Sequence, residues 1–351
     1  MQKKLRDYGI QIGNLETGTL NKITDVPGVK VGHSTISSGD IQTGVTVILP
    51  HTGNLFNNKV VGASYAMNGF GKSIGTLQVN ELGTIETPIL LTNTLSVGEC
   101  ATHLIDYMLE QNEHIGRTTG TVNTVIGECN DMFLNDIRTQ SIKKEHVLDA
   151  LHNADVNFEE GSIGAGRGMK CFGLKGGIGS SSRILSYPHG TYTMGVLVLS
   201  NFGELDQFRM NGIQMGPLLK QKLTSISPEG DKGSIMIIIG TDLPVTSRQL
   251  QRIIKRAGVG LSRTGSFIGN GSGDVFIGFS TANPIPHDKQ DTLLSIKVIH
   301  EEDIDQAFLA VADATEEAIL NSMLTAKTTV GREGNVLFSL ADFIEEIKME
   351  R

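Results

Sequence analysis

Tryptophan is absent from this sequence, and proline and aromatic residues are scarce. Among 351 residues there are 9 prolines, and Phe, Trp and Tyr together make up 5%. So few aromatic rings argue against base stacking, and so few prolines exclude a disordered Pro/Gly-rich chain. Basic residues are also in the minority, because 30 Lys and Arg face 38 Asp and Glu, for a net charge of −8. No long basic run offers the phosphate-neutralising surface that nucleic acid requires, so we expect no nucleic-acid partner.

Cysteine is rare too. The three cysteines, Cys100, Cys129 and Cys171, lie far apart and are odd in number. Their spacing excludes a CxxC zinc site and a disulfide framework, and it indicates a reducing compartment. The histidines form no HExxH pair, so the residues predict no metal site. The sequence has no apolar run of about 18 residues and no signal peptide at its start, so we expect a soluble cytoplasmic protein without a membrane partner.

Glycine, in contrast, is abundant, with 42 residues. Glycine suits tight turns and places where the backbone passes close to other backbone or to a ligand. Two glycine patterns resemble nucleotide-binding motifs but fail in detail. The Gly-Lys-Ser segment at 71–73 follows Ala66, where a phosphate loop needs its first glycine, and the pattern from Gly269 to Gly273 precedes a strand instead of opening a helix. We therefore do not predict nucleotide binding.

Short β-branched apolar runs alternate with helical patterns along the chain. The predicted strands cover residues 44–49, 121–126, 193–200, 233–240 and 274–280. Several are apolar at nearly every position, which indicates that both faces of the sheet are covered. The predicted helices are 96–111, capped by Ser96, a helix that begins at Thr246 or Ser247 and is ended by Gly258, 303–324, and 340–349. This alternation places the chain in the α/β class, and its length fits one large domain or two.

The clearest interruption of these patterns is the polar stretch 220–232. It contains Pro228 and Gly230 and leads directly into the apolar strand that begins at Ser234. An exposed loop that feeds a buried strand is a natural place for a chain boundary. An ordinary surface loop would have the same composition, so this stretch alone leaves both interpretations open.

Ser234 is the candidate nucleophile at this boundary. If the bond between Gly233 and Ser234 is cut, Ser234 gains a free α-amine beside its own hydroxyl. An α-amino group has a pKa of about 7.7–8.0, so a fair fraction is unprotonated at neutral pH and can act as a base. The glycine has no Cβ to hinder attack on its carbonyl, and it tolerates the distorted backbone of an N-to-O acyl shift. One residue would then supply both nucleophile and base.

Three other polar residues could complete such a site. Asn201, at the end of a predicted strand, offers an amide N–H donor for an oxyanion. Ser272 and Asp274, in a glycine-lined turn, could hold the ammonium or hydroxyl group of Ser234. Asn and Ser in loops commonly cap or turn the chain instead, so from the residues alone this is one arrangement among several.

Eight segments give the sequence a specific resemblance to a known family. They occupy 23–33, 44–50, 68–71, 81–83, 88–94, 164–169, 175–179 and 233–234, and include Gly164-Ala-Gly-Arg-Gly-Met and Lys175-Gly-Gly-Ile-Gly. In composition and order they resemble the DmpA-type aminopeptidases, which are the L-aminopeptidase/D-esterases and β-peptidyl aminopeptidases of peptidase family S58. The resemblance covers essentially the whole chain. It implies an α/β fold, a four-layer αββα sandwich shared with ornithine acetyltransferases and similar to N-terminal-nucleophile hydrolases, but differently connected.

The resemblance also implies a maturation step and an assembly. Family members are made as inactive precursors that cleave themselves before a serine. Here that predicts a single peptidase domain, 1–351, cut into an α chain, 1–233, and a β chain, 234–351. Members commonly form tetramers of processed protomers and need no metal or cofactor, so we expect a homotetramer with neither.

Several site residues follow from the resemblance by position. The family's oxyanion asparagine falls on Asn201, and its serine and acidic residue near the nucleophile fall on Ser272 and Asp274, the last of which is Glu in some members. A tyrosine that assists catalysis in some members falls on Asn130, which has no phenol to supply that role.

The expected reaction is the hydrolysis of N-terminal residues from peptides, and of amino-acid amides or esters, through an acyl-enzyme on Ser234. For the amino group of the substrate we expect an acidic or carbonyl-rich pocket, with Glu128 and Asp131 as candidates and Asn130 as a further substrate-binding candidate. Two alternatives stay open. One is an acyltransferase of the ornithine acetyltransferase type, whose members use threonine as nucleophile, and the other is an unprocessed, non-catalytic scaffold of the same fold. The sequence does not predict a preference for L-, D- or β-amino acid units.

Overall fold

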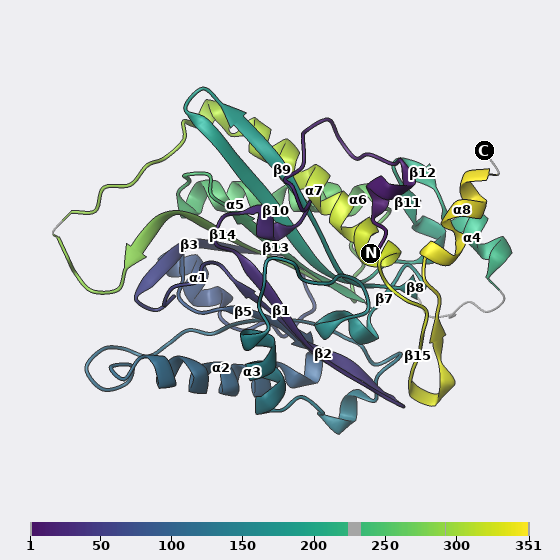
Figure 1. Ribbon diagram of the computed structural model, residues 1–351, viewed down its shortest axis with the longest axis horizontal. Helices are drawn as coiled ribbons and strands as arrows, with labels where there is room; N and C mark the ends of the chain where they lie inside the picture. Colours follow the sequence, from purple (N-terminus) through teal and green to yellow (C-terminus); the bar gives the residue numbers. More distant parts are fainter. Residues whose placement is uncertain (1, 224–232, 292, 350–351) are drawn as a thin grey trace.

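Two β-sheets lie face to face, and helices cover both outer faces (Figure 1). The structure is a computed structural model that describes residues 2–223, 233–291 and 293–349. One sheet has four strands in the order β1-β2-β5-β6, and the other has six in the order β4-β3-β14-β13-β10-β9. The expected four-layer αββα sandwich is therefore confirmed.

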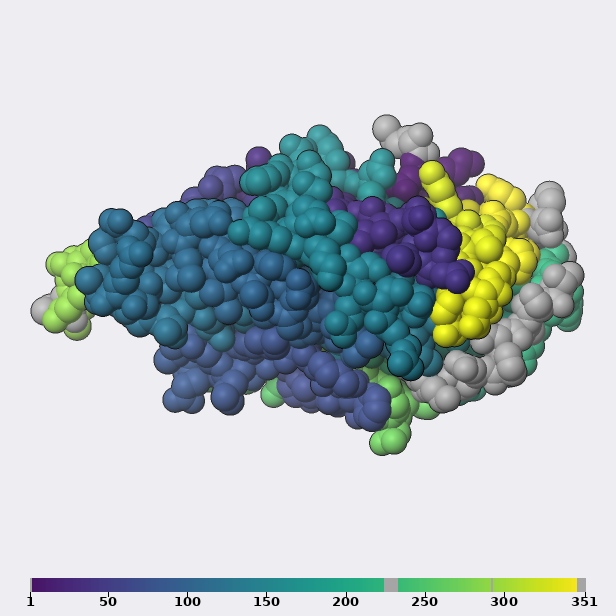
Figure 2. Space-filling view, turned by 90° about the horizontal axis from the view of Figure 1, so that it is seen from below, coloured from purple at the N-terminus to yellow at the C-terminus, as the bar shows by residue number. Residues whose placement is uncertain are grey.

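The four-stranded sheet is antiparallel except for its last pair, β5 and β6, which is parallel. Its strands are β1 (Lys30–Ser38), β2 (Ile41–Leu49), β5 (Ile89–Asn93) and β6 (Val125–Cys129). Helices α2 (Val97–Gln111) and α3 (Lys144–His152) cover its outer face, which is the side of the molecule seen in Figure 2. Their apolar side chains form one core cluster with Val45, Val47, Leu90 and Ile126 of the sheet.

The six-stranded sheet has five long strands and the two-residue strand β4. They are β3 (Asn58–Gly69), β4 (Thr84–Ile85), β9 (Gly177–Tyr187), β10 (Gly190–Asn201), β13 (Ser234–Thr241) and β14 (Gly273–Pro286). Strands β13 and β14 pair in parallel, and β10 pairs with β13 antiparallel. Helices α5 (Ser247–Lys255), α6 (Ala257–Arg263) and α7 (Asp305–Leu324) cover the outer face of this sheet (Figure 1).

Strand β13 shows why its sequence is apolar at nearly every position. Ile235, Ile237 and Ile239 belong to the core cluster that includes α5 and α7. Met236 and Ile238 point the other way, into the cluster between the two sheets. Because successive side chains of a strand alternate between its faces, a strand at the centre of four layers must be apolar on both.

Most predicted elements are present, with three corrections. The strand predicted at 121–126 begins only at Val125. Ser96 stands at the N-cap of α2 but its hydroxyl caps nothing, because the side chain of Asn93 accepts the N–H groups of Leu95 and Ser96 instead. Gly258 does not end a helix: it lies inside α6, where its missing Cβ leaves room for the side chain of Met67.

Shorter elements complete the chain. They are helices α1 (Thr76–Leu82), α4 (Gly216–Lys222) and α8 (Ala341–Met349), and the strand pairs β7 (Lys170–Cys171) with β8 (Leu174–Lys175), β11 (Arg209–Met210) with β12 (Ile213–Gln214), and β15 (Thr329–Val330) with β16 (Val336–Leu337). The proposed boundary loop follows α4, and its residues 224–232 lie outside the described part of the chain. Within that part, every helix is too short or too polar to cross a bilayer.

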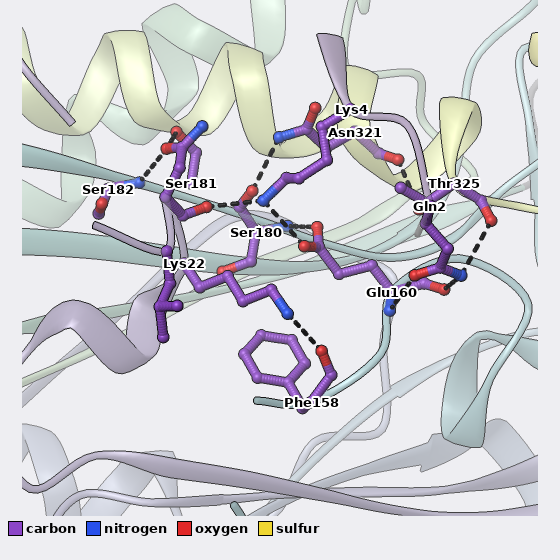
Figure 3. A network of polar contacts seen from close by, with 12 residues as sticks. Gln2, Lys4, Lys22, Phe158, Glu160, Ser180, Ser181, Ser182, Asn321 and Thr325 are labelled. Carbon is purple, nitrogen blue, oxygen red and sulfur yellow. Dashed lines mark hydrogen bonds and ion pairs between the residues drawn. The ribbon is translucent and has the colours of Figure 1, made fainter. Parts of the chain in front are cut away.

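The N-terminal segment is fixed to the six-stranded side by a buried polar network (Figure 3). The carboxylate of Glu160 pairs with Lys4 at 2.8 Å and accepts the backbone N–H of Ser180 on β9 at 2.7 Å. Gln2 donates to the carbonyl of Glu160 at 2.8 Å, and Asn321 on α7 donates to the carbonyl of Ser180 at 2.9 Å. Each of these polar groups thus has a partner, which offsets the cost of removing it from water.

Candidate active site

Strand register brings Ser234 and Asn201 together. Ser234 is the first residue of β13 and Asn201 is the last residue of β10, and the two lie directly opposite each other in the antiparallel ladder. Both residues are 5% exposed, so they sit just below the surface at the ends of two central strands. The expected pairing of nucleophile and amide donor is therefore geometrically possible.

The first residue of β14 brings a backbone donor to the serine. The N–H of Gly273 donates to Oγ of Ser234 at 3.1 Å. A Cβ on Gly273 would lie 3.1 Å from the same oxygen and 2.7 Å from the carbonyl of Phe70, so only glycine allows this close approach. The parallel pairing of Ile235 with Asp274 keeps this end of β14 at the start of β13.

Ser272 and Asp274 flank this glycine, as expected from the sequence. The hydroxyl of Ser272 donates to Oδ1 of Asp274 at 2.9 Å, and both residues are almost fully buried. The contact that reaches the hydroxyl of Ser234 directly, however, is the N–H of Gly273. Sequence reasoning missed this donor because it considered side chains, although the Gly-Ser-Gly-Asp pattern contained the glycine that the approach requires.

The side chain of Asn201 is fixed at both ends. Its Oδ1 accepts the N–H of Lys170 at 2.8 Å, and its Nδ2 donates to the carbonyl of Asn130 at 3.0 Å. The bond to Lys170 determines which end of the amide is oxygen and which is nitrogen. The nitrogen, the end that can stabilise an oxyanion, is thereby held in one place before any substrate arrives.

Gly233 fits closely against the end of β10. A Cβ there would lie 2.6 Å from the carbonyl carbon of Asn201 and 2.8 Å from Cα of Phe202, and closer still to the carbonyl oxygen of Asn201. These are backbone atoms, which cannot rotate away as the end of a side chain can. The residue before the serine is therefore glycine for a packing reason that the sequence did not reveal.

Glu128 enters the site from the other sheet. It lies on β6, the edge strand of the four-stranded sheet, and is 3% exposed. Its carboxylate accepts the backbone N–H of Lys72 at 2.9 Å and the hydroxyl of Thr94. A Cβ on Gly71 would be 3.4 Å from Glu128 Oε1 and 3.9 Å from Cα of Gly273, so one backbone segment separates this carboxylate from the turn that contacts Ser234.

Asp131 and Asn130 are placed differently from Glu128. Asp131 is fully buried, and its Oδ1 accepts the side-chain N–H of Asn135 at 3.0 Å. Burial raises the pKa of Asp131 to about 7, against hydrogen bonds and the charge of Lys175 that lower it. The side chain of Asn130 accepts the N–H of Met132 at 3.0 Å, as in an Asx turn. None of the contacts described for these two side chains joins them to Ser234.

The cysteines and other ligand-type residues add no second chemistry here. All three cysteines are free and buried, and burial raises the pKa of both Cys100 and Cys129. Among the residues that the structure describes, no three His, Cys, Asp or Glu side chains gather as metal ligands would. The candidate site is thus a serine hydroxyl with amide and backbone N–H donors and a nearby carboxylate.

Comparison with known proteins identifies the family of the chain. The sequence model of peptidase family S58 matches residues 21–337. The chain belongs to peptidase family S58. A curated relative, beta-peptidyl aminopeptidase BapA of Sphingosinicella microcystinivorans, is 34% identical over 355 aligned positions that cover 94% of this chain and 88% of the relative.

Solved structures of S58 relatives superpose over nearly the whole chain. A protein from Pyrococcus horikoshii OT3 is 48% identical, with 99% of each chain covered and a TM-score of 0.93. A beta-aminopeptidase from Burkholderia sp. is 35% identical, with 99% of each chain covered and a TM-score of 0.92. The L-aminopeptidase D-Ala-esterase/amidase of Ochrobactrum anthropi, described as a prototype of the serine aminopeptidases and a variant of the Ntn hydrolase fold, is 31% identical, with 99% of this chain and 98% of that chain covered and a TM-score of 0.92. The family and these relatives support a hydrolase with aminopeptidase function.

Proposed function

We propose that this S58 member is a self-processing serine aminopeptidase that acts through an acyl-enzyme on Ser234. The observation that carries the proposal is the meeting of Ser234, Asn201 and the N–H of Gly273, which lie at the end of β10 and at the starts of β13 and β14. A hydroxyl held by a backbone donor, with an oriented amide opposite, suits acyl transfer at a carbonyl.

Maturation comes first in this proposal. Oγ of Ser234 attacks the carbonyl carbon of Gly233, the C–N bond breaks, and the peptide nitrogen leaves as the α-amine of Ser234. Water then hydrolyses the ester, which leaves residues 1–233 with a new carboxyl end and frees the serine hydroxyl. The product is a residue that carries a nucleophile and a base together.

Turnover then uses the new amine. The α-amine of Ser234 accepts the hydroxyl proton while Oγ attacks the carbonyl after the first residue of the substrate. Nδ2 of Asn201 and nearby backbone N–H groups stabilise the oxyanion, the leaving amine takes up the proton, and water releases the acyl group. Glu128 supplies the negative charge that would attract the free ammonium group of the substrate.

The decisive experiment compares three purified proteins by intact mass. The wild type is expected to give two fragments split after Gly233, and Ser234→Ala a single chain of 37.7 kDa. Ser186→Ala, which changes an exposed serine on β9, is the matched control and should be cut normally. A Ser234→Ala protein that is still cut at this bond would contradict the proposal.

Two further assays separate the alternatives. Aminoacyl p-nitroanilides and amides of L-, D- and β-amino acids measure hydrolysis and its preference, and transfer of acetyl from acetylornithine to glutamate measures the acyltransferase alternative. A single uncut wild-type chain without either activity would indicate a scaffold. The homotetramer and the cytoplasmic location remain predictions, and light scattering after size-exclusion chromatography tests the first.

A further inference from the structure

A fully buried lysine lies directly behind the candidate oxyanion donor. Lys175, on β8, has no exposed surface, and its Nζ donates to the carbonyls of Gly166, Met169 and Gly176 at 2.9, 3.0 and 2.8 Å. Three acceptors at these distances match the three N–H donors of an ammonium group, whereas a neutral amine has only two. The geometry therefore indicates a buried positive charge.

One of these carbonyls belongs to the peptide group that orients Asn201. The oxygen of Met169 and the N–H of Lys170 are the two ends of a single peptide unit, and such a unit is planar. Nζ of Lys175 donates to the Met169 oxygen at 3.0 Å, and the N–H of Lys170 donates to Oδ1 of Asn201 at 2.8 Å. The backbone N–H of Gly176 also donates to the Met169 oxygen at 3.0 Å, which helps to fix the plane.

The chain of hydrogen bonds from Lys175 through the peptide group between residues 169 and 170, which we call the relay, ends at the side-chain nitrogen of Asn201. Because Oδ1 is held by the Lys170 N–H, Nδ2 must point the other way, where it donates one hydrogen to the carbonyl of Asn130 at 3.0 Å. Linked hydrogen bonds polarise one another, so a positive charge at the far end of the peptide strengthens Lys170 N–H as a donor and, through it, the Nδ2–H groups of Asn201. The charge thus acts on the oxyanion donor both by position and by polarisation.

We propose that Lys175 is a positioning residue for catalysis, acting on Asn201 through the peptide group between residues 169 and 170. The inference rests on the proposed function, because it assigns Asn201 to the oxyanion. Lys175 touches neither Ser234 nor substrate in this scheme. It keeps the amide nitrogen of Asn201 in the orientation that both self-cleavage and turnover require.

The surroundings of Lys175 contain its counter-charge. Burial of Lys175 and the charge of Arg167 disfavour its ammonium form. The charges of the buried acid Asp131 and of Cys171 favour it. A Cβ on Gly168 would lie 2.8 Å from Cβ of Asp131. Asp131 therefore packs against the backbone just before Met169, and its charge favours the ammonium form of Lys175 from there.

If Lys175 only stabilised the fold, its loss would lower the stability and leave kcat unchanged. Kinetic measurements therefore distinguish this role from a positioning role. Lys175→Met keeps an unbranched side chain, one heavy atom shorter, but removes the charge and the donors. We expect its kcat on aminoacyl p-nitroanilides to fall about 10- to 100-fold, less than the loss of a whole oxyanion donor, with KM changed by no more than about twofold. Self-cleavage after Gly233 should slow in parallel, and Lys175→Arg should recover part of kcat because it restores a cation.

Arg183→Met is the matched control. Arg183 is also a fully buried cation, paired with Glu317 at 2.7 Å, but it lies opposite Met194, seven residues along β10 from Asn201. Its loss should lower the melting temperature while kcat stays near that of the wild type. A folded Lys175→Met enzyme with wild-type kcat, or one that differs from Arg183→Met only in stability, would overturn the positioning role.

A second variant covers the case in which Lys175→Met does not fold. Lys170→Pro retains Lys175 and its three carbonyls but deletes the N–H that reaches Asn201, and it should lower kcat by a similar factor. Retained kcat in this variant would equally refute the relay. The wild type and Ser234→Ala are assayed alongside: an inactive wild type refutes the proposed function, whereas an active wild type beside an equally active Lys175→Met or Lys170→Pro refutes the relay alone.

Discussion

Adding one methyl group at Gly233 should block the maturation of this protein. Alanine at this position places a Cβ 2.6 Å from the carbonyl carbon of Asn201 and 2.8 Å from Cα of Phe202. Real Cβ atoms essentially never approach other heavy atoms this closely, so something must move. The obstacle is the backbone at the end of β10, so moving Gly233 away from it pulls on the adjacent Ser234, which pairs with Asn201.

The size of the effect follows from that geometry. Overpacking a well-filled site costs about 1–3 kcal/mol, and a backbone obstacle places Gly233→Ala near the upper limit. Since about 1.4 kcal/mol corresponds to a factor of ten, a cost of about 3 kcal/mol that falls on the cleavage transition state slows it about 100-fold. A shift of about 1 Å between nucleophile and oxyanion donor would produce a loss of the same order.

The assay is a time course of self-cleavage followed by intact mass, starting from freshly refolded chain. Gly98→Ala is the matched control, because a Cβ there meets nothing within 4 Å and the residue lies in α2, where alanine is favourable. Gly98→Ala should be cut at the wild-type rate. If Gly233→Ala is cut equally fast, the close fit between Gly233 and the end of β10 does not control maturation, and the reasoning is refuted.

Three more predictions concern residues around the site. Asn201→Ala should lower kcat by about 10²–10³, with a smaller change in KM, in steady-state assays; an unchanged kcat would remove it from the oxyanion site. Glu128→Gln should raise KM for substrates with a free amino terminus about tenfold or more, because a charge-assisted hydrogen bond is lost. It should leave self-cleavage unaffected, and slower self-cleavage would argue for another role of Glu128. Because burial raises the pKa of Asp131 to about 7 from 3.8, the folded state binds its proton more tightly. The extra stability that this proton gives is present in full below about pH 4 and is lost as the pH rises to about 7. Over that range the free energy of unfolding of the wild type should fall by about 4 kcal/mol. Denaturant unfolding of Asp131→Asn should lack this decline.

Much of the fold could be read from local sequence. The apolar runs at 44–49, 193–200 and 274–280 lie within strands, and the run at 233–240 does so from Ser234 onward, since short β-branched segments that are apolar on both sides have few alternatives to a covered sheet. The sequence prediction failed where a residue that resembles a local structural signal instead serves a contact in the tertiary structure. Gly258 resembled a helix stop, but it is glycine because Met67 packs against it. Asp131 stays a candidate substrate ligand, and the structure adds that its side chain is enclosed beside Asn135 and Gly168.

In the candidate site, too, the sequence indicated the individual groups but not their contacts. The Gly233-Ser234 pair, the turn around Gly273 and the isolated Asn201 were visible as chemistry in the sequence, because each depends on what one residue type can do. Their meeting was not visible, since it depends on the register of β10 with β13 and on the parallel pairing of β13 with β14. Register is set by the packing of whole faces, and a shift of one residue would turn these side chains to the opposite side of the sheet.

Sequence alone therefore determined the kinds of group available to this protein: a serine that can carry its own base, an amide donor, acids, and central strands that need cover on both faces. Tertiary structure alone decided which groups meet. It placed Glu128 of one sheet beside the turn of the other, gave the hydroxyl of Ser234 a backbone donor, and set a buried lysine behind Asn201. The reason is physical: contacts between residues far apart in the chain arise from the cooperative packing of four layers, and no local pattern specifies them.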